Sequence, residues 1–267
     1  MNYLKESWLR WVGWLVLASL FAVACVFLSQ WQFARRGEAV AKIDLVLANY
    51  DREAVPVEEL VDPANFDPAL EWRPVQLRGS FVTDAAHLVR NRPLNGQPGF
   101  LQVIPFKLSS GAIVLVETGW LPTSSDLGVP NSIPLPGNNE QTITARIRPS
   151  EPELGRDAPT GQLATISPKA LADKTGLEPV QSFYVRLTKQ YSESAPKLLL
   201  KPELTEGNHL SYALQWILFA LMGFAALIWA IRQEMLFKRA AADPNFVVKK
   251  KRRLGDSDKE YEDSLTQ

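Results

Sequence analysis

One histidine stands near two aromatic residues at helical spacing. His209, Tyr212 and Trp216 are separated by three and four residues, so on a helix they lie along one face. The histidine precedes a charge-free run, 210–231, and a neutral imidazole with aromatic neighbours at such a place is what an axial ligand of a flat, largely apolar haem requires. The same residues fit a plainer interpretation, in which the aromatic side chains mark a membrane–water interface and Asn208 and His209 cap a helix.

A second group of polar and aromatic residues follows the other charge-free run of the chain. Trp31, Gln32, Arg35 and Arg36 come shortly after residues 11–29. If the two runs end at the same depth, the guanidiniums could pair with haem propionates while Trp31 packs on the ring. The alternative is that both arginines simply face water.

Other kinds of site find little support in the composition. The sequence contains no GxSxG, HExxH, GxxxxGK[ST] or Gly-rich dinucleotide motif, so we do not expect an enzyme. The single cysteine, Cys25, rules out an internal disulfide, and two histidines leave little for a zinc or di-iron centre. The second histidine, His87, lies in an alternating stretch typical of a surface or edge strand. The 29 Lys and Arg residues balance the 29 Asp and Glu residues, so no nucleic-acid partner is expected.

The two charge-free runs are long enough to cross a membrane. Residues 11–29 make a helix of about 28 Å and residues 210–231 one of about 33 Å, against a hydrocarbon core of about 30 Å. The first run could instead be a signal peptide, because small residues precede Cys25 as in a lipoprotein cleavage site. The apolar run continues past the cysteine, beyond the length of a signal-peptide core, so we expect an uncleaved anchor.

The charge distribution predicts how the chain is oriented. Lysines and arginines near the spans are more frequent on the side of the termini. This bias predicts a two-pass protein of the cell (plasma or inner) membrane with both termini in the cytoplasm. The predicted segments are a cytoplasmic N-terminus (1–10), a transmembrane helix (11–29), an extracytoplasmic domain (30–209), a second transmembrane helix (210–231) and a basic, then acidic, cytoplasmic tail for which we expect disorder (232–267).

The segment between the spans predicts a mostly antiparallel α+β domain, flanked by the two transmembrane helices. Helical spacing of apolar residues continues the first span over 30–49, and serine, proline and glycine signals predict a short helix at 168–174. A Ser-Ser-Gly turn at 109–111 joins the clearest hairpin, and the proline-rich stretch 122–139 predicts a loop. Runs rich in Val, Ile, Thr and Phe predict strands at 72–82, 86–91, 99–107, 112–118, 141–147, 162–167 and 181–189.

Three blocks of sequence occur in a distinctive order. They are WQ-x-x-R at 31–35, a hairpin from Gly-Phe to Gly-Trp-Leu-Pro at 99–122, and NHLSYALQW at 208–216. Together with the two spans and the domain between them, these blocks resemble the Surfeit locus protein 1 family of cytochrome c oxidase assembly factors, over roughly residues 8–232. The third block is the most specific of the three.

The resemblance implies a non-enzymatic assembly factor of haem–copper cytochrome c oxidase, which holds or delivers haem a to subunit I at the outer membrane surface. Its partners would be subunit I, other respiratory-chain or assembly proteins, haem a and the lipid bilayer. It makes His209 the candidate ligand of the haem iron, and Gly119 and Trp120 residues that support the fold of the outer domain. The residues implied around the haem are Trp31, Gln32, Arg35, Tyr212, Gln215 and Trp216.

One departure and two alternatives qualify this expectation. Glu117-Thr118 stands where the family has a neutral residue and an arginine before Gly-Trp. Within the family, the alternative is a structural accessory subunit that docks on the oxidase without binding haem. A two-span extracytoplasmic sensor or chain-length regulator shares the topology, but such regulators rely on long outer helices, whereas this outer domain predicts strands. A sensor also needs a cytoplasmic output domain.

Overall fold

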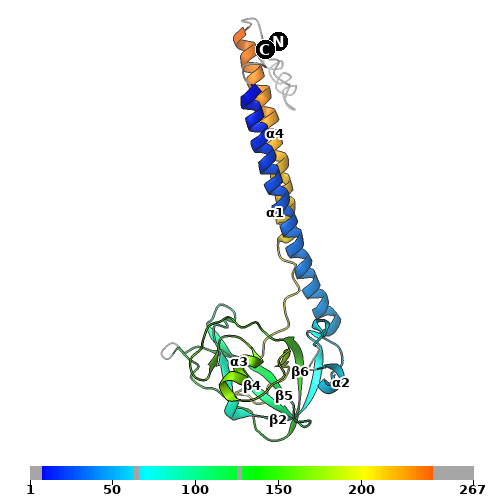
Figure 1. Cartoon of the computed structure of the whole chain (residues 1–267), viewed down its shortest axis with the longest axis vertical. Helices are drawn as coiled ribbons and strands as arrows, with labels where there is room; N and C mark the ends of the chain where they lie inside the picture. Colours follow the sequence, from blue (N-terminus) through cyan, green and yellow to red (C-terminus); the bar gives the residue numbers. More distant parts are fainter. Residues whose placement is uncertain (1–7, 63–65, 125–127, 243–267) are drawn as a thin grey trace, which may run out of the picture. The chain divides into compact units, whose positions relative to one another are not determined.

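The computed structural model describes residues 8–62, 66–124 and 128–242. The chain divides into two compact units (Figure 1). Among the described residues, one contains 8–38 together with 207–242, and the other contains those between 39 and 206.

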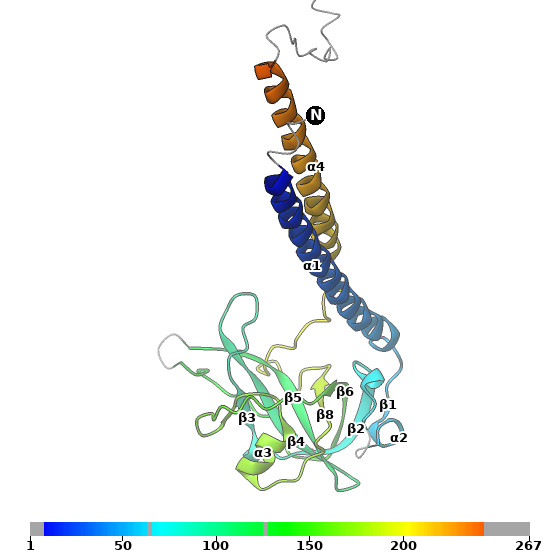
Figure 2. The same cartoon turned by 45° about the horizontal axis from the view of Figure 1, so that its top comes forward.

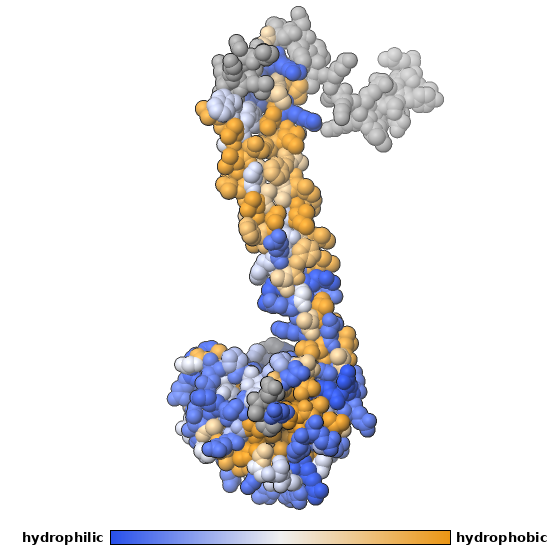
Figure 3. Space-filling view, turned by 45° about the vertical axis from the view of Figure 1, so that its right-hand side comes forward, coloured by the Kyte–Doolittle hydropathy of each residue, from blue (hydrophilic) through white to orange (hydrophobic). Residues whose placement is uncertain are grey.

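Two long helices make up the described part of the first unit, except that the last residues of the first helix, 39–49, belong to the second unit. Helix α1 covers Trp8–Asn49 and helix α4 covers His209–Ala242, and both are long and apolar enough to cross a membrane. Their apolar side chains are widely exposed, as the orange surface of the helices in Figure 3 shows, and such exposure suits contact with lipid rather than water. The helices indicate a two-pass membrane protein.

Small residues form the contact between the two helices. Cys25, Ser29 and Ala213 are buried there, and the Ser29 hydroxyl donates a hydrogen bond of 3.0 Å to the carbonyl oxygen of Ala213. Small side chains allow helices to approach closely in a membrane, where packing and interhelical hydrogen bonds replace the hydrophobic effect as the source of association.

Both helices extend beyond the apolar runs. The continuation of α1 to Asn49 confirms the helix predicted over 30–49. The expectation of disorder from residue 232 onward is wrong for 232–242, which complete α4. This segment consists of good helix formers, and Lys238 pairs with Glu234 at a separation of four residues and 3.0 Å. Residues 243–267 of the predicted tail, like 1–7 of the predicted N-terminus, lie outside the described residues.

The second unit is built mainly from strands (Figure 2). The described strands form one eight-stranded sheet, accompanied by the short helices α2 (Val57–Leu60) and α3 (Pro168–Thr175) and two 3-10 turns (Pro68–Leu70 and Thr83–Ala85). The strands are β1 (Val55–Pro56), β2 (Pro74–Phe81), β3 (His87–Val89), β4 (Gly99–Leu108), β5 (Ile113–Pro122), β6 (Gln141–Pro149), β7 (Gln162–Leu163) and β8 (Phe183–Leu187).

Five of these strands close into a barrel in the order β2-β6-β8-β5-β4, with β4 returning to β2. The β5–β8 pairing is parallel, and the other four barrel pairings are antiparallel. Gly79 forms the corner, since it pairs with Gln141 of β6 and with Leu108 of β4. A β-carbon at Gly79 would lie 2.0 Å from the carbonyl oxygen of Lys107, so only glycine fits this closure.

The closed barrel corrects the α+β architecture expected from the sequence. A sheet-rich domain between two apolar helices was predicted, but its helices α2 and α3 cover only four and eight residues. The barrel is closed by the pairing of β2 with β4. The sequence did not reveal this pairing, because each of the two strands also pairs with another strand of the barrel. The structure confirms the general arrangement that was expected, namely two candidate membrane helices that flank a sheet-rich domain in the sequence.

The predicted elements otherwise appear where the local signals place them. Every expected strand overlaps an observed one, although β4, β5 and β6 run past the expected ends and β7 is much shorter than 162–167; only β1 was missed among the described strands. The hairpin turn at 109–111 is confirmed. Helix α3 begins after Ser167, whose side chain accepts a bond from the Ala170 N–H, and ends at Gly176 with φ of 70°.

Alternate residues of the barrel strands build the core. Side chains such as Leu77, Phe106 and Val185 are fully buried in one apolar cluster shared by all five barrel strands. A second cluster forms where α3 and the segment before it cover the outside of β5 and β8, with Leu115, Leu171 and Tyr184 buried. The barrel wall is therefore rigid on both faces in this region.

Candidate functional site

The structure brings together two of the residues implied around the haem. Gln32 of α1 and His209, the first residue of α4, are 177 positions apart, yet the Gln32 Oε1 and His209 Nδ1 atoms are 2.9 Å apart. Gln32 lies one turn beyond Ser29, and His209 one turn before Ala213, so the contact continues the buried seam between the helices. Both side chains are half-buried.

This hydrogen bond determines the chemistry of the imidazole. An amide oxygen can only accept, so the Nδ1 atom of His209 carries the proton and donates it to Gln32. In the neutral ring, the lone pair then resides on Nε2. A histidine whose second nitrogen donates to a fixed acceptor is the usual arrangement of a metal-ligating histidine, because the acceptor fixes the tautomer and orients the ring. The residues therefore fit a group that takes one neutral nitrogen ligand.

The aromatic residues of the candidate site take different environments. Trp31 is 57% exposed and Tyr212 is 50% exposed, so both offer flat apolar surface beside the helix seam. Trp216 is half-buried and packs edge-on against Phe219, with ring centroids 5.8 Å apart. Gln215 is exposed.

Arg35 forms an ion pair with a neighbouring residue of the same helix. Its Nη1 atom lies 2.7 Å from Oε2 of Glu38, three residues further along α1, and both side chains are exposed. An exposed pair of this kind contributes little energy, so it can exchange partners without a large cost. The predicted contact between Arg35 and a propionate stays a prediction.

The hairpin block contributes to the barrel through close backbone contacts. Gly119 has φ of 144°, and a β-carbon there would lie 2.7 Å from the carbonyl oxygen of Lys197. Trp120 is buried, and its indole N–H donates a bond of 2.6 Å to the carbonyl oxygen of Arg92. A β-carbon at Gly99 would lie 2.4 Å from the Trp120 ring. These contacts give Gly119 and Trp120 the structural role expected of them.

The departure at Glu117 is accommodated by a partner that the sequence did not reveal. Glu117 of β5 and Arg186 of β8 face each other in the parallel pairing, and their two contacts are 2.9 and 3.0 Å long. The Glu117 side chain is fully buried. Burial raises the pKa of the Glu117 carboxyl above its ordinary value, and the Arg186 guanidinium opposes that rise. The nearest sequence signal was the charge of Glu117 itself within an apolar strand.

The neighbouring residue, Thr118, belongs to a second polar network. Its hydroxyl donates a 2.6 Å bond to Oε1 of Gln102, whose Nε2 donates a 2.7 Å bond to the carbonyl oxygen of Pro134. The hydroxyl of Tyr191 donates to the same carbonyl at 2.8 Å. The network ties the loop after β5 to the barrel wall. Glu117 and Thr118, the two residues that differ from the family pattern, thus both have hydrogen-bond partners inside the domain.

His87 of β3, the other histidine, is half-buried, and its Nδ1 atom lies 2.9 Å from the carbonyl oxygen of Ala85. The expectation was a surface or edge-strand histidine: strand β3 lies between β4 and β7 and is not an edge strand, but β7 pairs only with Leu88 and Val89, and His87 itself is partly exposed. The short strand β7 covers the edge that the sequence pattern suggested would be open. His87 shares neither the helix seam nor the aromatic surroundings of His209.

Two apolar helices, a barrel domain between them in sequence and a hydrogen-bonded histidine at the start of the second helix define a membrane-anchored β-barrel protein. The SURF1 family model matches residues 19–221, and this chain belongs to the SURF1 (Surfeit locus protein 1) family. Uncharacterized SURF1-like proteins of Mycobacterium bovis and Mycobacterium tuberculosis are each 30% identical to it over 225 residues, which cover 79% of this chain and 80% of the relatives.

Proposed function

We propose that this protein is a non-enzymatic assembly factor of haem–copper cytochrome c oxidase, which holds haem a or delivers it to subunit I at the outer surface of the cell membrane. In this proposal both termini are cytoplasmic and the barrel domain is outside. The observation that supports it best is the hydrogen bond between Gln32 and His209, in a chain of a family generally tied to oxidase assembly.

The chemistry of the site suits a carrier better than a permanent haem protein. Gln32 holds the Nδ1 proton of His209 and leaves Nε2 available as a single axial ligand. The exposed faces of Trp31 and Tyr212 add apolar surface for the macrocycle. Haem would be the cargo here. A single neutral ligand on an open surface would hold it weakly enough to permit its release.

Comparison of two histidine variants tests the proposal. The full chain is purified in detergent from cells that make haem a, and its reduced-minus-oxidised spectrum is recorded for the wild type, His209→Ala and His87→Ala. We expect a haem a band in the wild type and in His87→Ala, and none in His209→Ala. His87 is a matched control because it is the other histidine of the chain and lies in β3.

Gln32 variants separate orientation from ligation. Gln32→Leu removes the acceptor of the Nδ1 proton, and loss of such a partner typically weakens a metal site by about 10- to 100-fold. Gln32→Glu keeps an acceptor and should retain more haem.

An undiminished band in His209→Ala would refute the ligand assignment. Oxidase subunits that co-purify with no haem in any variant would instead favour the structural accessory subunit.

A further inference from the structure

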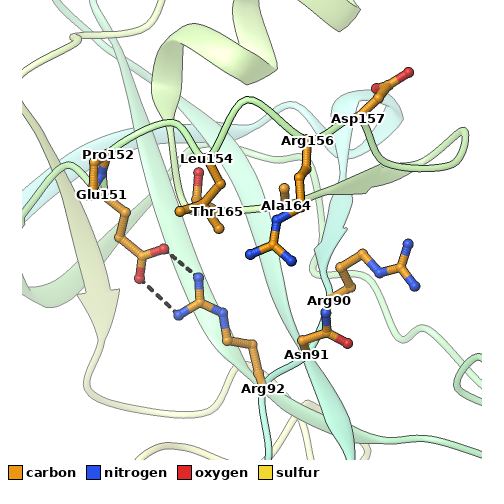
Figure 4. A pocket seen from close by; sticks show the side chains of 10 residues that line it. All are labelled: Arg90, Asn91, Arg92, Glu151, Pro152, Leu154, Arg156, Asp157, Ala164 and Thr165. Carbon is orange, nitrogen blue, oxygen red and sulfur yellow. Dashed lines mark hydrogen bonds and ion pairs between the residues drawn. The ribbon is translucent and has the colours of Figure 1, made fainter.

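A cavity in the barrel unit is lined by three arginines (Figure 4). Its volume is about 610 Å³, within the range of small-molecule sites. Arg90 and Arg92 come from the segment directly after β3, and Arg156 comes from the loop between β6 and β7. The cavity uses none of the residues around His209.

One of the three arginines is already neutralised. Arg92 makes a two-pronged contact with Glu151, with Nη1 and Oε1 2.9 Å apart, as the dashed lines in Figure 4 show. Glu151 is fixed in turn, because its Oε2 accepts a 2.9 Å bond from the backbone N–H of Ile166. This pair forms a rigid, electrically neutral wall of the cavity.

The other two arginines have unused donors. Within the described residues, the side chains of Arg90 and Arg156 form no hydrogen bond or ion pair, and the Nε atom of Arg90 is buried. The nearby Asp157 does not compensate them, since Lys174 contacts it at 3.2 Å. Figure 4 shows the Arg156 guanidinium turned into the hollow towards Arg92, whereas the Arg90 guanidinium extends away from the other two. The lining therefore carries two arginines whose charge no described side chain pairs with, one of them turned into the hollow.

The backbone that carries Arg90 and Arg92 is held at three points. The N–H of Arg90 donates to the carbonyl of Leu163, and the N–H of Arg92 to that of Gly99, at 3.1 and 2.9 Å. The carbonyl of Arg92 accepts the indole N–H of Trp120. The hairpin block thus fixes the wall of the cavity, and a site arranged before its ligand arrives loses less entropy on binding.

We propose that this cavity binds a phosphate group, carried by a small molecule or by a lipid headgroup. The Arg156 guanidinium in the hollow, with Arg90 as a second unpaired arginine of the same lining, matches the charge near −2 and the several oxygens of a phosphate monoester better than the single charge of one carboxylate. The cavity is larger than a bare phosphate, and Leu154, 48% exposed on its wall, offers apolar contact to the rest of the ligand.

Titration calorimetry of the full chain in detergent tests the site with two compounds, at constant ionic strength maintained with chloride. The first is inorganic phosphate, and the second is dihexanoyl phosphatidic acid below its micellar concentration. We expect saturable binding of at least one compound. Arg156→Gln and Arg90→Gln should each weaken it by about 10- to 100-fold, the range expected for loss of a charge-assisted contact.

Two further variants make the test specific. Arg78→Gln is the matched control, because Arg78 is an exposed arginine of β2 that pairs with Glu140 at 3.0 Å, outside the cavity. It should bind like the wild type. Glu151→Gln removes the charge that neutralises Arg92 and should tighten binding several-fold, a direction that general damage to the fold would not produce.

Each result of the titration bears on the proposal. Binding of phosphatidic acid alone, lost in Arg156→Gln, would identify a lipid headgroup as the source of the phosphate. If both compounds bind and both lose affinity in Arg156→Gln, the result would support a small phosphorylated molecule as well. Absence of saturable binding for both compounds, or an equal loss in Arg78→Gln, would overturn it. Arg156 is exposed, so its variant reports on the site without a folding defect.

Discussion

Removing Arg186 should destabilise the barrel strongly, because it leaves a charged partner inside. The Glu117 side chain is 0% exposed and that of Arg186 is 17% exposed, and two hydrogen bonds join them between β5 and β8. The substitution Arg186→Met keeps most of the packing against Trp72, whose ring lies 5.5 Å from the guanidinium. It therefore isolates the effect of the charge.

The magnitude follows from the burial of the pair. Breaking one partner of a buried ion pair costs about 3–5 kcal/mol, because the remaining buried charge loses its hydrogen-bonded partner and does not regain water. The double variant Glu117→Leu/Arg186→Met removes both charges and should recover to within about 1–2 kcal/mol of the wild type. Domains of this size are stabilised by about 5–15 kcal/mol, so the single variant loses a large share of that stability.

The single variant should also acquire a distinct pH dependence. Burial already raises the pKa of Glu117 from its ordinary value of 4.5, and loss of Arg186 removes the main group that opposes the rise. A raised folded-state pKa means that the folded chain keeps a proton that the unfolded chain releases. The contribution of Glu117 to the free energy of unfolding of Arg186→Met should thus be fully present below pH 4.5 and fall, by up to about 1.4 kcal/mol per pH unit, as the pH rises towards the folded-state pKa.

Pulse proteolysis of the full chain in detergent, over a series of urea concentrations, measures these values. The wild type, the two single variants and the double variant form a complete cycle that gives the coupling energy directly. A loss below about 1 kcal/mol in Arg186→Met, or a double variant as unstable as the single one, would refute the reasoning that the charge is truly buried.

Two further perturbations test other parts of the barrel. Gly79→Ala places a β-carbon 2.0 Å from the Lys107 carbonyl oxygen and should cost about 1–3 kcal/mol or more by pulse proteolysis. Gly37→Ala, with open space on α1, should be harmless, and equal effects of the two substitutions would contradict the closure argument. Burial raises the pKa of Tyr191 to about 12 from 10.0, so the unfolded chain loses this proton first and stability should fall by less than about 2 kcal/mol between pH 10 and 12. Tyr184, which is more deeply buried, also has a raised pKa, so Tyr191→Phe should remove one of the late-titrating phenols from the absorbance titration at alkaline pH; an unchanged titration would contradict its assignment.

Several parts of this protein could be predicted from the sequence because their causes are local. The membrane helices follow from uninterrupted apolar runs, and α3 follows from Ser167 at its start and Gly176 at its end. The hairpin of β4 and β5 follows from its turn at 109–111. The family follows from short motifs that remain in order along the chain, and the family model confirms it.

The tertiary structure decided the features that join distant residues. Closure of the barrel depends on the corner at Gly79, and the partner of Glu117 is 69 positions away in β8. The sequence placed Gln32 and His209 near the same site, but only the packing of α1 against α4 gave them a hydrogen bond across 177 positions. The cavity of Arg90, Arg92 and Arg156 likewise required two loops to meet. Spacing along a chain specifies helices and turns through neighbouring residues, whereas pairing between strands and helices depends on the topology, which local spacing does not encode.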